Sequence, residues 1–470
     1  MNSTPDLSAD KGVGLPGRTL IATAMFRLRG LLSVAAILAL VAGCADQRAA
    51  PVPDALRAPV PITTPQTLAQ IPVVTPEPIA PTNEARPQEP VDAQPIPPVV
   101  EPVPPVAMPA EPAPAVRPLI EGPPVKVAIL LPLSGANAAL GQALLRAAQL
   151  ALFEVGDSRF VLLPRDTEGQ PKGAVAAAEN ALAESAELIL GPIFSAEVQA
   201  AAQVTRSRNI PMVAFSTDRA AAGNGVFLMG FMPEQQVTRV MSYAVDKGIR
   251  RFAALLPDSP YGMTLSAAMR RGARDLNVAF DHQESYSGAI AEAGEPIRRL
   301  KGESLTSPTG FDALLIGEGG ERLRTIGALL PANNIDPRVV RLLGTGLWDD
   351  PGIGGEAALV GGWFAGATPG EFDAFLSRYR RHYGATDVLP RIGTLAYDAT
   401  ALAAVLARTE TRANYSEATL TNPSGFAGVD GIFRFGPDGV VERGLAIIEV
   451  ERNGFRVISP SPASFEDLTN

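Results

Sequence analysis

The stretch from Val125 to Asp157 has the pattern of a buried strand, a tight turn and an amphipathic helix. Residues 125–131 are almost continuously apolar, which is typical of a parallel strand covered by helices on both faces. Ser134 and Gly135 follow with turn chemistry, and leucines then recur at helical spacing. In an open α/β sheet such a strand-to-helix turn lies at the carboxyl edge, where ligands are usually bound.

The chain after this stretch continues to alternate between strand and helix patterns, which is the signature of parallel sheets flanked by helices. The predicted strands are 160–163, 186–190, 211–215, 251–256, 311–316 and 340–343. The predicted helices are 172–185, 196–206, 234–247 and 263–276. Pro164 is expected to end its strand, and Ser195 to cap its helix. Two such series joined by a connection predict two lobes.

The chain before residue 125 has two further patterns. Arg27 and Arg29 precede a short apolar run that ends in Val41-Ala42-Gly43-Cys44, which indicates an export signal over residues 1–43. The run is too short to span a bilayer stably. We hypothesise that translation starts at Met25; a precursor peptide containing Pro5 would contradict this.

Residues 44–124 have the composition of a disordered linker. Proline accounts for 23 of the 80 residues from Ala45 to Pro124, and acidic residues outnumber basic ones nine to four. Such a segment cannot bury enough apolar surface to offset its ordering entropy. In polyproline II geometry its upper reach is about 250 Å. We therefore expect an extended tether that carries a folded domain away from a membrane.

Composition excludes several function classes. A net charge of −9 opposes nucleic-acid binding, which needs clustered positive charge. Two histidines and one cysteine leave little material for a metal site. The chain has no Walker, G-x-S-x-G or H-E-x-x-H motif, and Gly317-Glu318-Gly319-Gly320 lacks the third glycine of a dinucleotide fingerprint. We interpret Asp349 and Asp350 as a solvated loop, and expect neither a cofactor nor an enzyme.

The sequence around Cys44 resembles the lipobox of bacterial lipoproteins, through Val41, Ala42, Gly43 and Cys44. The resemblance implies that Cys44 is acylated and becomes the new amino terminus, and several acyl chains anchor a protein durably. In enteric-type bacteria an aspartate directly after the cysteine retains a lipoprotein in the inner membrane. Ala45 at that position implies sorting to the inner face of the outer membrane.

From Val125 onward the chain resembles the type I periplasmic binding proteins, in the branch of leucine, isoleucine and valine receptors. The motifs are VAILLPLSG at 127–135, LILGPIFS at 188–195, IPMVAFST at 210–217 and LPDSPYGMTL at 256–265. The resemblance implies a domain over 125–470 with three crossovers and a cleft between its lobes. We expect an N-lobe of about 125–241 and 365–427, and a C-lobe of about 242–364 and 428–460. Pro437-Asp438-Gly439 also predicts a hairpin turn.

The same resemblance implies candidate ligand contacts in the cleft, in addition to Ser134 at the first turn. In amino-acid receptors the ligand carboxylate and ammonium are bound at positions that map to Ser195 and to Ser216 or Thr217. A tyrosine that closes over the ligand maps to Tyr261, and an acid for the ammonium maps to Glu318. Ser195 and Ser216 are equally interpretable as helix caps. Small apolar residues at 136, 138 and 139 depart from the amino-acid-receptor pattern.

Lipobox, linker and binding domain together resemble the outer-membrane lipoproteins that activate penicillin-binding proteins. The resemblance implies a domain that reaches through the peptidoglycan and stimulates a bifunctional synthase. Better-known members carry a helical-repeat domain where this chain has its proline-rich segment. The alternative is a substrate-binding receptor of an ABC transporter for an amino acid or amide, with a small ligand in the cleft.

Overall fold

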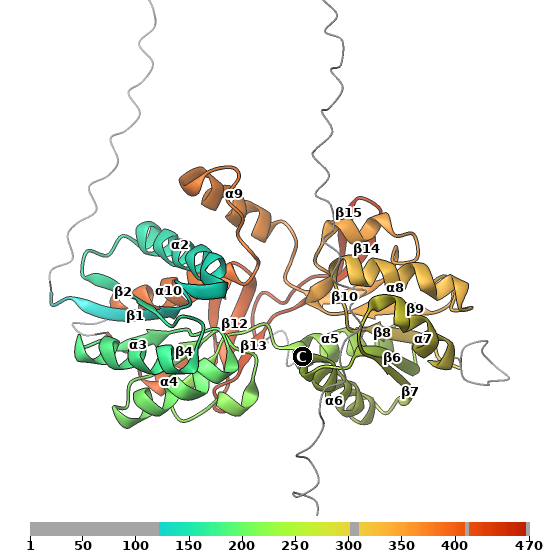
Figure 1. Cartoon of the computed structure of the whole chain (residues 1–470), viewed down its shortest axis with the longest axis horizontal. Coiled ribbons are helices and arrows are strands. Elements are labelled where there is room, and N and C mark those ends of the chain that lie inside the picture. Colours follow the sequence, from blue (N-terminus) through green and yellow to red (C-terminus); the bar gives the residue numbers. More distant parts are fainter. Residues whose placement is uncertain (1–121, 301–309, 409–412, 467–470) are drawn as a thin grey trace, which may run out of the picture. The chain divides into compact units, whose positions relative to one another are not determined.

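The computed structural model describes residues 122–300, 310–408 and 413–466, which belong to one compact unit of the chain. The two larger sheets, one parallel and one mainly parallel, have helices on both faces, which confirms the predicted two-lobed α/β fold (Figure 1). The start at Met25, the lipidation site Cys44 and the tether lie outside the described residues.

The first lobe is built on a five-stranded parallel sheet of order β2-β1-β3-β4-β5. Its strands are β1 (Val125–Leu131), β2 (Phe160–Asp166), β3 (Leu188–Leu190), β4 (Met212–Ala214) and β5 (Val226–Leu228). Its helices are α2 (Ala138–Val155), α3 (Pro171–Ala183), α4 (Ser195–Ser207), α9 (Glu371–Tyr383), α10 (Gly393–Arg408) and α11 (Glu417–Leu420). The helix α2 packs on α10, and α3 packs on α4 (Figure 1).

The second lobe is built on a sheet of order β15-β14-β10-β9-β8-β6-β7, in which β14 and β15 are antiparallel to their neighbours. Its strands are β6 (Arg251–Pro257), β7 (Ala279–Tyr286), β8 (Ala313–Ile316), β9 (Arg341–Gly344), β10 (Trp363–Gly366), β14 (Ala446–Glu451) and β15 (Gly454–Ser459). Its helices are α5 (Pro233–Asp246), α6 (Pro260–Asp275), α7 (Gly294–Leu300) and α8 (Gly320–Ala332).

The strand β6 explains why the central strands are almost wholly apolar. Ala253 and Leu255 belong to the hydrophobic cluster that includes residues of α7 and α8. Phe252, Ala254 and Leu256 belong to the cluster that includes residues of α5 and α6. Successive side chains of a strand point to opposite faces, so a strand covered on both faces must be apolar throughout.

A third, antiparallel sheet consists of β11 (Phe426–Gly428), β12 (Gly431–Phe435) and β13 (Val441–Arg443). The predicted hairpin is therefore present as β12 and β13. Gly439, in its turn, has a φ of +77°, a conformation that favours glycine. Phe433 and Phe435 of β12 pack into the core of the first lobe.

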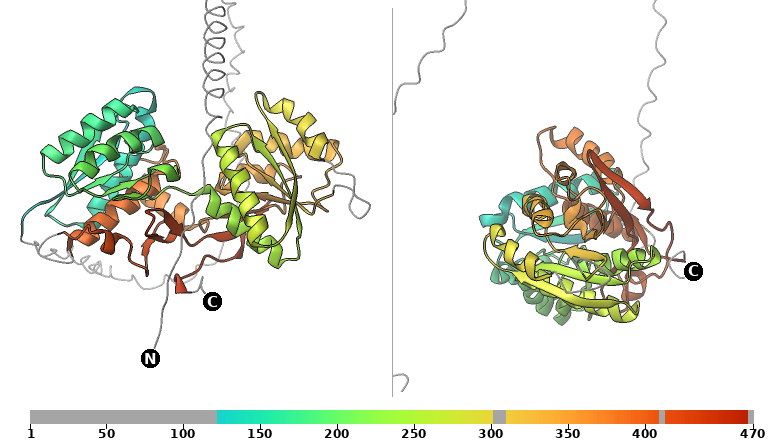
Figure 2. Two further views of the ribbon diagram at one scale, coloured as in Figure 1. Left: turned by 90° about the horizontal axis from the view of Figure 1, so that it is seen from below. Right: turned by 90° about the vertical axis from the view of Figure 1, so that its right-hand side faces the viewer.

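The chain crosses between the lobes three times, after β5, after β10 and after β13 (Figure 2). Val237, Val240 and Met241 of α5 pack in the core of the second lobe. The chain therefore enters the second lobe before Pro233, and it enters this lobe for the last time after Arg443. The expected lobe boundaries were near residues 241 and 428.

Two local expectations were wrong. Pro164 does not end β2, because β2 is an edge strand, where the missing N–H of proline is tolerated; Pro164 lies opposite Ile129. Ser195 does not cap α4, because it is the first residue of the helix and Phe194 is the N-cap. Among the described residues, no helix is long and apolar enough to cross a bilayer, and no group of three or more His, Cys, Asp or Glu side chains is placed to hold a metal ion.

Candidate functional site

The turn after β1 is bonded to a carboxylate from the end of β2. Asp166 Oδ1 accepts hydrogen bonds from the backbone N–H groups of Leu133 at 2.8 Å, Ser134 at 3.2 Å and Glu168 at 2.8 Å. Burial opposes ionisation of Asp166, but the hydrogen bonds from Ser134 and these backbone groups keep its pKa below the usual value. Ser134 is exposed, and its backbone N–H is occupied by the chain's own acid.

The fold brings together the predicted ligand contacts Ser195, after β3, and Ser216, after β4. Both are hydrogen-bonded to Asp218 of the chain itself. The Ser195 hydroxyl donates to Asp218 Oδ2, and Gln199 Nε2 donates to the same oxygen at 3.0 Å. Ser216 is buried, and its hydroxyl accepts from the Asp218 N–H at 3.1 Å, so it stabilises a turn and caps no helix. Hydrogen bonding from Ser195 lowers the pKa of Asp218. Thr217 is exposed beside this group.

The two expected contacts of the second lobe are also bonded within the chain. The Tyr261 hydroxyl lies 2.8 Å from Thr345 Oγ1, and burial raises the pKa of Tyr261 to about 12. Glu318 Oε1 accepts from the Tyr286 hydroxyl and from Arg322 Nε at 3.1 Å. Tyr261 lines a cavity at the junction of the lobes, and Glu318 is not among the residues that line it.

This junction cavity has a volume of about 220 Å³. Segments of both lobes and of the crossovers line it. Its apolar side chains come from Phe231, Pro233, Tyr261, Leu347, Ala367 and Leu445. Its polar side chains come from Gln236, Asp349, Arg391, Asp430 and Arg443. Apolar walls with a few convergent charges are the usual surroundings of a small organic ligand.

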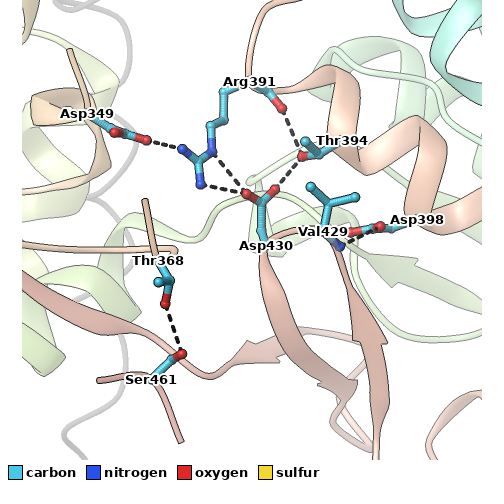
Figure 3. A network of polar contacts seen from close by, with 8 residues as sticks. All are labelled: Asp349, Thr368, Arg391, Thr394, Asp398, Val429, Asp430 and Ser461. Carbon is cyan, nitrogen blue, oxygen red and sulfur yellow. Dashed lines mark hydrogen bonds and ion pairs between the residues drawn. The ribbon is translucent and has the colours of Figure 1, made fainter. Parts of the chain in front are cut away.

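Arg391 links the two lobes beside the cavity (Figure 3). Its Nη1 pairs with Asp349, which follows β9, and its Nη2 lies 2.7 Å from Oδ1 of Asp430, which precedes β12. The Thr394 hydroxyl also donates to Asp430. The interpretation of Asp349 as solvated loop was therefore wrong: burial raises its pKa, and Arg391 opposes that rise. The neighbouring Asp350 accepts from Gly352 N at 2.9 Å.

Arg443, the last residue of β13, is 5% exposed at the third crossover. Its Nη2 donates to the carbonyl of Met229, in the first crossover, at 2.8 Å. The guanidinium lies 5.0 Å from the ring centroid of Phe231 and 5.4 Å from that of Phe433. Its Nε and Nη1 have no hydrogen-bond acceptor among the described residues. Burial lowers its pKa, and Asp430 and Asp398 oppose this.

Asp398, in α10, completes the charged group. Its Oδ1 accepts from Val429 N at 2.9 Å (Figure 3), and its Oδ2 is buried with no partner in the described part of the chain. Gly428 allows the close approach, because a Cβ there would lie 2.3 Å from Asp398 Oδ2. Burial raises the pKa of Asp398 to about 7, and nearby Asp430 acts in the same direction.

Sequence reasoning missed Arg391, Asp430 and Arg443. Arg391 comes from a segment without a motif, whereas Asp430 and Arg443 lie at the two ends of the predicted hairpin; only the tertiary fold brings the three together. A weak signal was present at Asp398, an acid within the almost wholly apolar sequence of α10, since buried charges need partners.

Two lobes with three crossovers and a polar junction between them define a two-lobed binding protein. The model of the periplasmic binding protein family matches residues 124–455, and the chain belongs to this family.

Solved structures with this fold include proteins of transport systems. A putative branched-chain amino acid ABC transporter protein from Rhodospirillum rubrum is 20% identical, with a TM-score of 0.61 over 71% of this chain and 100% of its own. LivJ from Streptococcus pneumoniae, solved with isoleucine, is 19% identical, with a TM-score of 0.53. The match covers 72% of this chain and 100% of LivJ. A solute-binding protein from Rhodopseudomonas palustris, solved with 4-hydroxybenzoate, is 18% identical, with a TM-score of 0.54. The match covers 74% of this chain and 100% of that protein.

Among curated proteins, an uncharacterized protein from Rickettsia prowazekii is 22% identical over 220 residues. The match covers 46% of this chain and 59% of the length of that relative.

We expect leucine to leave the melting temperature of the described domain unchanged at millimolar concentration. The Ser195 hydroxyl and the N–H groups of Leu133 and Ser134 are already bonded to Asp218 and Asp166, and these two carboxylates would also repel a ligand carboxylate. A ligand at 100 times its Kd would stabilise the fold by about 2.7 kcal/mol, so a thermal-shift titration is sensitive enough. A saturable rise with leucine would contradict this expectation.

Proposed function

We propose that the chain is a non-catalytic lipoprotein, anchored through Cys44 to the inner face of the outer membrane, that activates a peptidoglycan synthase. The observation that carries this proposal is the self-bonded cleft. The Ser195 hydroxyl is bonded to Asp218 and the N–H groups of the turn after β1 are bonded to Asp166, so neither is free to bind a carboxylate ligand. A binding fold in which these groups are satisfied internally is suited to present its outer surface to another protein.

The anchor and the linker support the same proposal. The chain's single cysteine is at the lipobox position, and the proline-rich segment has an upper reach of about 250 Å. A receptor that feeds a transporter must meet a permease in the inner membrane, which an outer-membrane anchor opposes. A tether of this length suits a partner on the far side of the wall.

The activation mechanism is a population shift. The domain binds one conformation of the bifunctional penicillin-binding protein more tightly than the other, and so increases the active population. No residue of the domain needs to take part in the synthase chemistry. A tenfold increase in the active population requires about 1.4 kcal/mol of differential affinity.

The proposal predicts that Cys44→Ala releases the chain from the membrane fraction and abolishes incorporation of labelled palmitate. Lipid chains are the anchor, and the apolar run before Cys44 is too short to replace them. The measurement is fractionation with palmitate labelling of cells that express the native chain or the variant. An unlabelled native chain would contradict the anchor.

Binding to the synthase is tested with the full chain in detergent and the purified bifunctional penicillin-binding protein, by biolayer interferometry. We expect saturable binding that a purified ABC permease does not reproduce. Absence of binding at micromolar concentrations would count against the proposal.

The second candidate is a receptor for an amino acid or amide, and the junction cavity favours it. Arg391 and Arg443 beside apolar walls could bind a carboxylate with an apolar body. Isoleucine and 4-hydroxybenzoate, found in the solved relatives, are carboxylates of this kind. A thermal-shift screen of amino acids, amides and aromatic acids tests the receptor, and a hit lost in Arg391→Gln would favour it.

A further inference from the structure

A second large cavity lies beside the crossovers, separate from the junction cavity. Its volume is about 910 Å³, which is in the range of pockets that hold small organic ligands. We call it the hinge groove; it is lined by Arg219, one face of α5, Arg271, residues 442, 443 and 445, and residues 460–462. Among the described residues, only Arg443 and Leu445 line both cavities.

The floor of the hinge groove is the polar face of α5. The groove residues at positions 234, 235, 238, 239 and 242 recur at helical spacing, so they share one face of the helix. The other face carries Val237, Val240 and Met241, which are buried in the core of the second lobe. The helix α6 packs beside α5 (Figure 1) and contributes Arg271. The floor is therefore preformed by packed helices.

The unpaired charges of the hinge groove are mostly positive. Arg239, Arg271 and Arg443 form no ion pair within the described residues, and neither does Glu234. Three positive charges against one negative charge leave an excess of two positive charges. This excess lies on a chain whose net charge is −9. Like charges that share a groove repel one another, so the groove attracts an anion.

The remaining charged residues of the groove are neutralised by partners outside it. Arg219 pairs with Asp438 at 2.9 Å, and Glu442 pairs with Arg434 at 2.7 Å. These two pairs leave the positive excess of the groove unchanged.

Two of the unpaired arginines are fixed in place and keep donors to spare. Arg239 donates from Nε to the Leu445 carbonyl at 3.0 Å and from Nη2 to Ser459 Oγ at 2.8 Å, which leaves its Nη1 without an acceptor in the described part of the chain. Arg443 is 5% exposed, and its buried Nε and Nη1 also lack an acceptor there. A buried donor without an acceptor is costly, so an acidic ligand group at this wall would stabilise the groove.

The groove also offers hydroxyl and apolar contacts. The side chains of Thr238 and Ser242 make no hydrogen bond within the described residues, and both belong to the floor. Leu445, Pro460 and Pro462 form an apolar part of the lining. Guanidinium groups bind carboxylates and phosphates in a bidentate manner, and the apolar part suits an organic body.

We propose that the hinge groove binds a small organic molecule that carries two or more carboxylate or phosphate groups. The acidic groups neutralise the unpaired arginines, and the organic body packs on the two prolines. The bound molecule contacts both lobes, because α5 packs in the second lobe and Val441 of β13 packs in the core of the first. The site is independent of the proposed activation of a synthase.

The test titrates the full chain in detergent with citrate and with pyrophosphate by isothermal titration calorimetry. Sodium chloride holds the ionic strength at about 100 mM, where charges still interact over about 10 Å. We expect saturable binding of at least one probe, with a Kd of about 1 mM or tighter. Acetate, which carries a single acidic group, should bind about tenfold more weakly or not at all.

Two variants shift the affinity in opposite directions. Arg271→Glu is expected to weaken binding about tenfold or more, because it replaces an attractive contact by a repulsive one. Glu234→Gln is expected to strengthen binding about threefold, because it removes the unpaired acid of the groove. A gain in affinity cannot result from loss of the fold, so the pair of variants separates binding from stability.

Matched controls carry the same changes outside the groove. Arg274→Glu reverses an exposed arginine of the same helix α6, and Glu321→Gln neutralises an exposed acid of α8. Both controls should bind the probes like the native chain. Melting temperatures confirm that every variant is folded.

Binding of citrate alone would identify the acidic groups as carboxylates, and binding of pyrophosphate alone would identify them as phosphates; either result supports the site. Absence of binding of both probes at about 10 mM overturns it. An affinity that is unchanged in Arg271→Glu also overturns it, because the anion then binds elsewhere. An equal loss in Arg274→Glu overturns it as well, since binding then follows net charge alone.

Discussion

Replacing Arg443 by alanine is expected to lower the free energy of unfolding by about 3–5 kcal/mol. The side chain is 5% exposed, and it bonds the carbonyl of Met229 across two crossovers. Its removal leaves Asp430 and Asp398 with less positive charge nearby and opens a void between Phe231 and Phe433. Denaturant unfolding followed by circular dichroism measures the change.

Two control variants test whether the loss of stability in Arg443→Ala comes from the buried guanidinium. Arg443→Lys keeps the charge but loses the planar group, so it should lose less stability than the alanine variant. Arg452→Ala removes an exposed arginine and should change the free energy of unfolding by about 0.5 kcal/mol or less. A loss below about 1 kcal/mol in Arg443→Ala would mean that the buried charges do not stabilise the junction.

Asp398→Asn is expected to stabilise the fold above neutral pH and to leave it unchanged near pH 4. The pKa of Asp398 is raised from 3.8 to about 7 by burial, so the folded state binds this proton more tightly than the unfolded chain does. Stability is therefore complete below about pH 4 and is lost as the pH rises through 7. The full shift corresponds to about 4 kcal/mol, which asparagine would recover at pH 8.

The measurement is the free energy of unfolding of both chains between pH 4 and pH 8. The native chain should lose stability relative to the variant over this window, and the two should agree at its acid end. A constant difference across the window would show that Asp398 is ionised throughout, with Arg443 as its counter-charge.

The fold was predictable because its signals are local and repeated. An apolar run such as residues 125–131 followed by turn chemistry and a helical pattern appears in both lobes, and each run marks a strand covered on both faces. Pro164 was misjudged because its tolerance depends on the edge position of β2, which is decided by strand order.

The site was only partly predictable. Ser195 and Ser216 do lie together, as expected of the ends of neighbouring strands, but nothing in the local sequence pairs Ser195 with Asp218. The junction of Arg391, Asp349 and Asp430 joins segments that are far apart in the chain. Such contacts follow from tertiary packing, and no spacing of residues encodes them.

The internally bonded groups after β1 and β3 favour an activator of the synthase, whereas the junction cavity favours a ligand receptor. Ser195 and Tyr261 would dominate the function of a receptor, because they would contact its ligand. In an activator their replacement should matter little, since the outer surface carries the interaction. Glycan synthesis in the presence of Ser195→Ala with Tyr261→Phe therefore separates the two, provided that both variants stay folded.

The most direct test of the account is peptidoglycan synthesis from lipid-linked precursor by the bifunctional penicillin-binding protein, with and without the fragment Val125–Asn470. This fragment contains the hydrophobic clusters of both lobes. The account predicts a dose-dependent rise in glycan polymerisation or cross-linking, unchanged by added amino acids. No change in either activity at a saturating concentration of the fragment would contradict it.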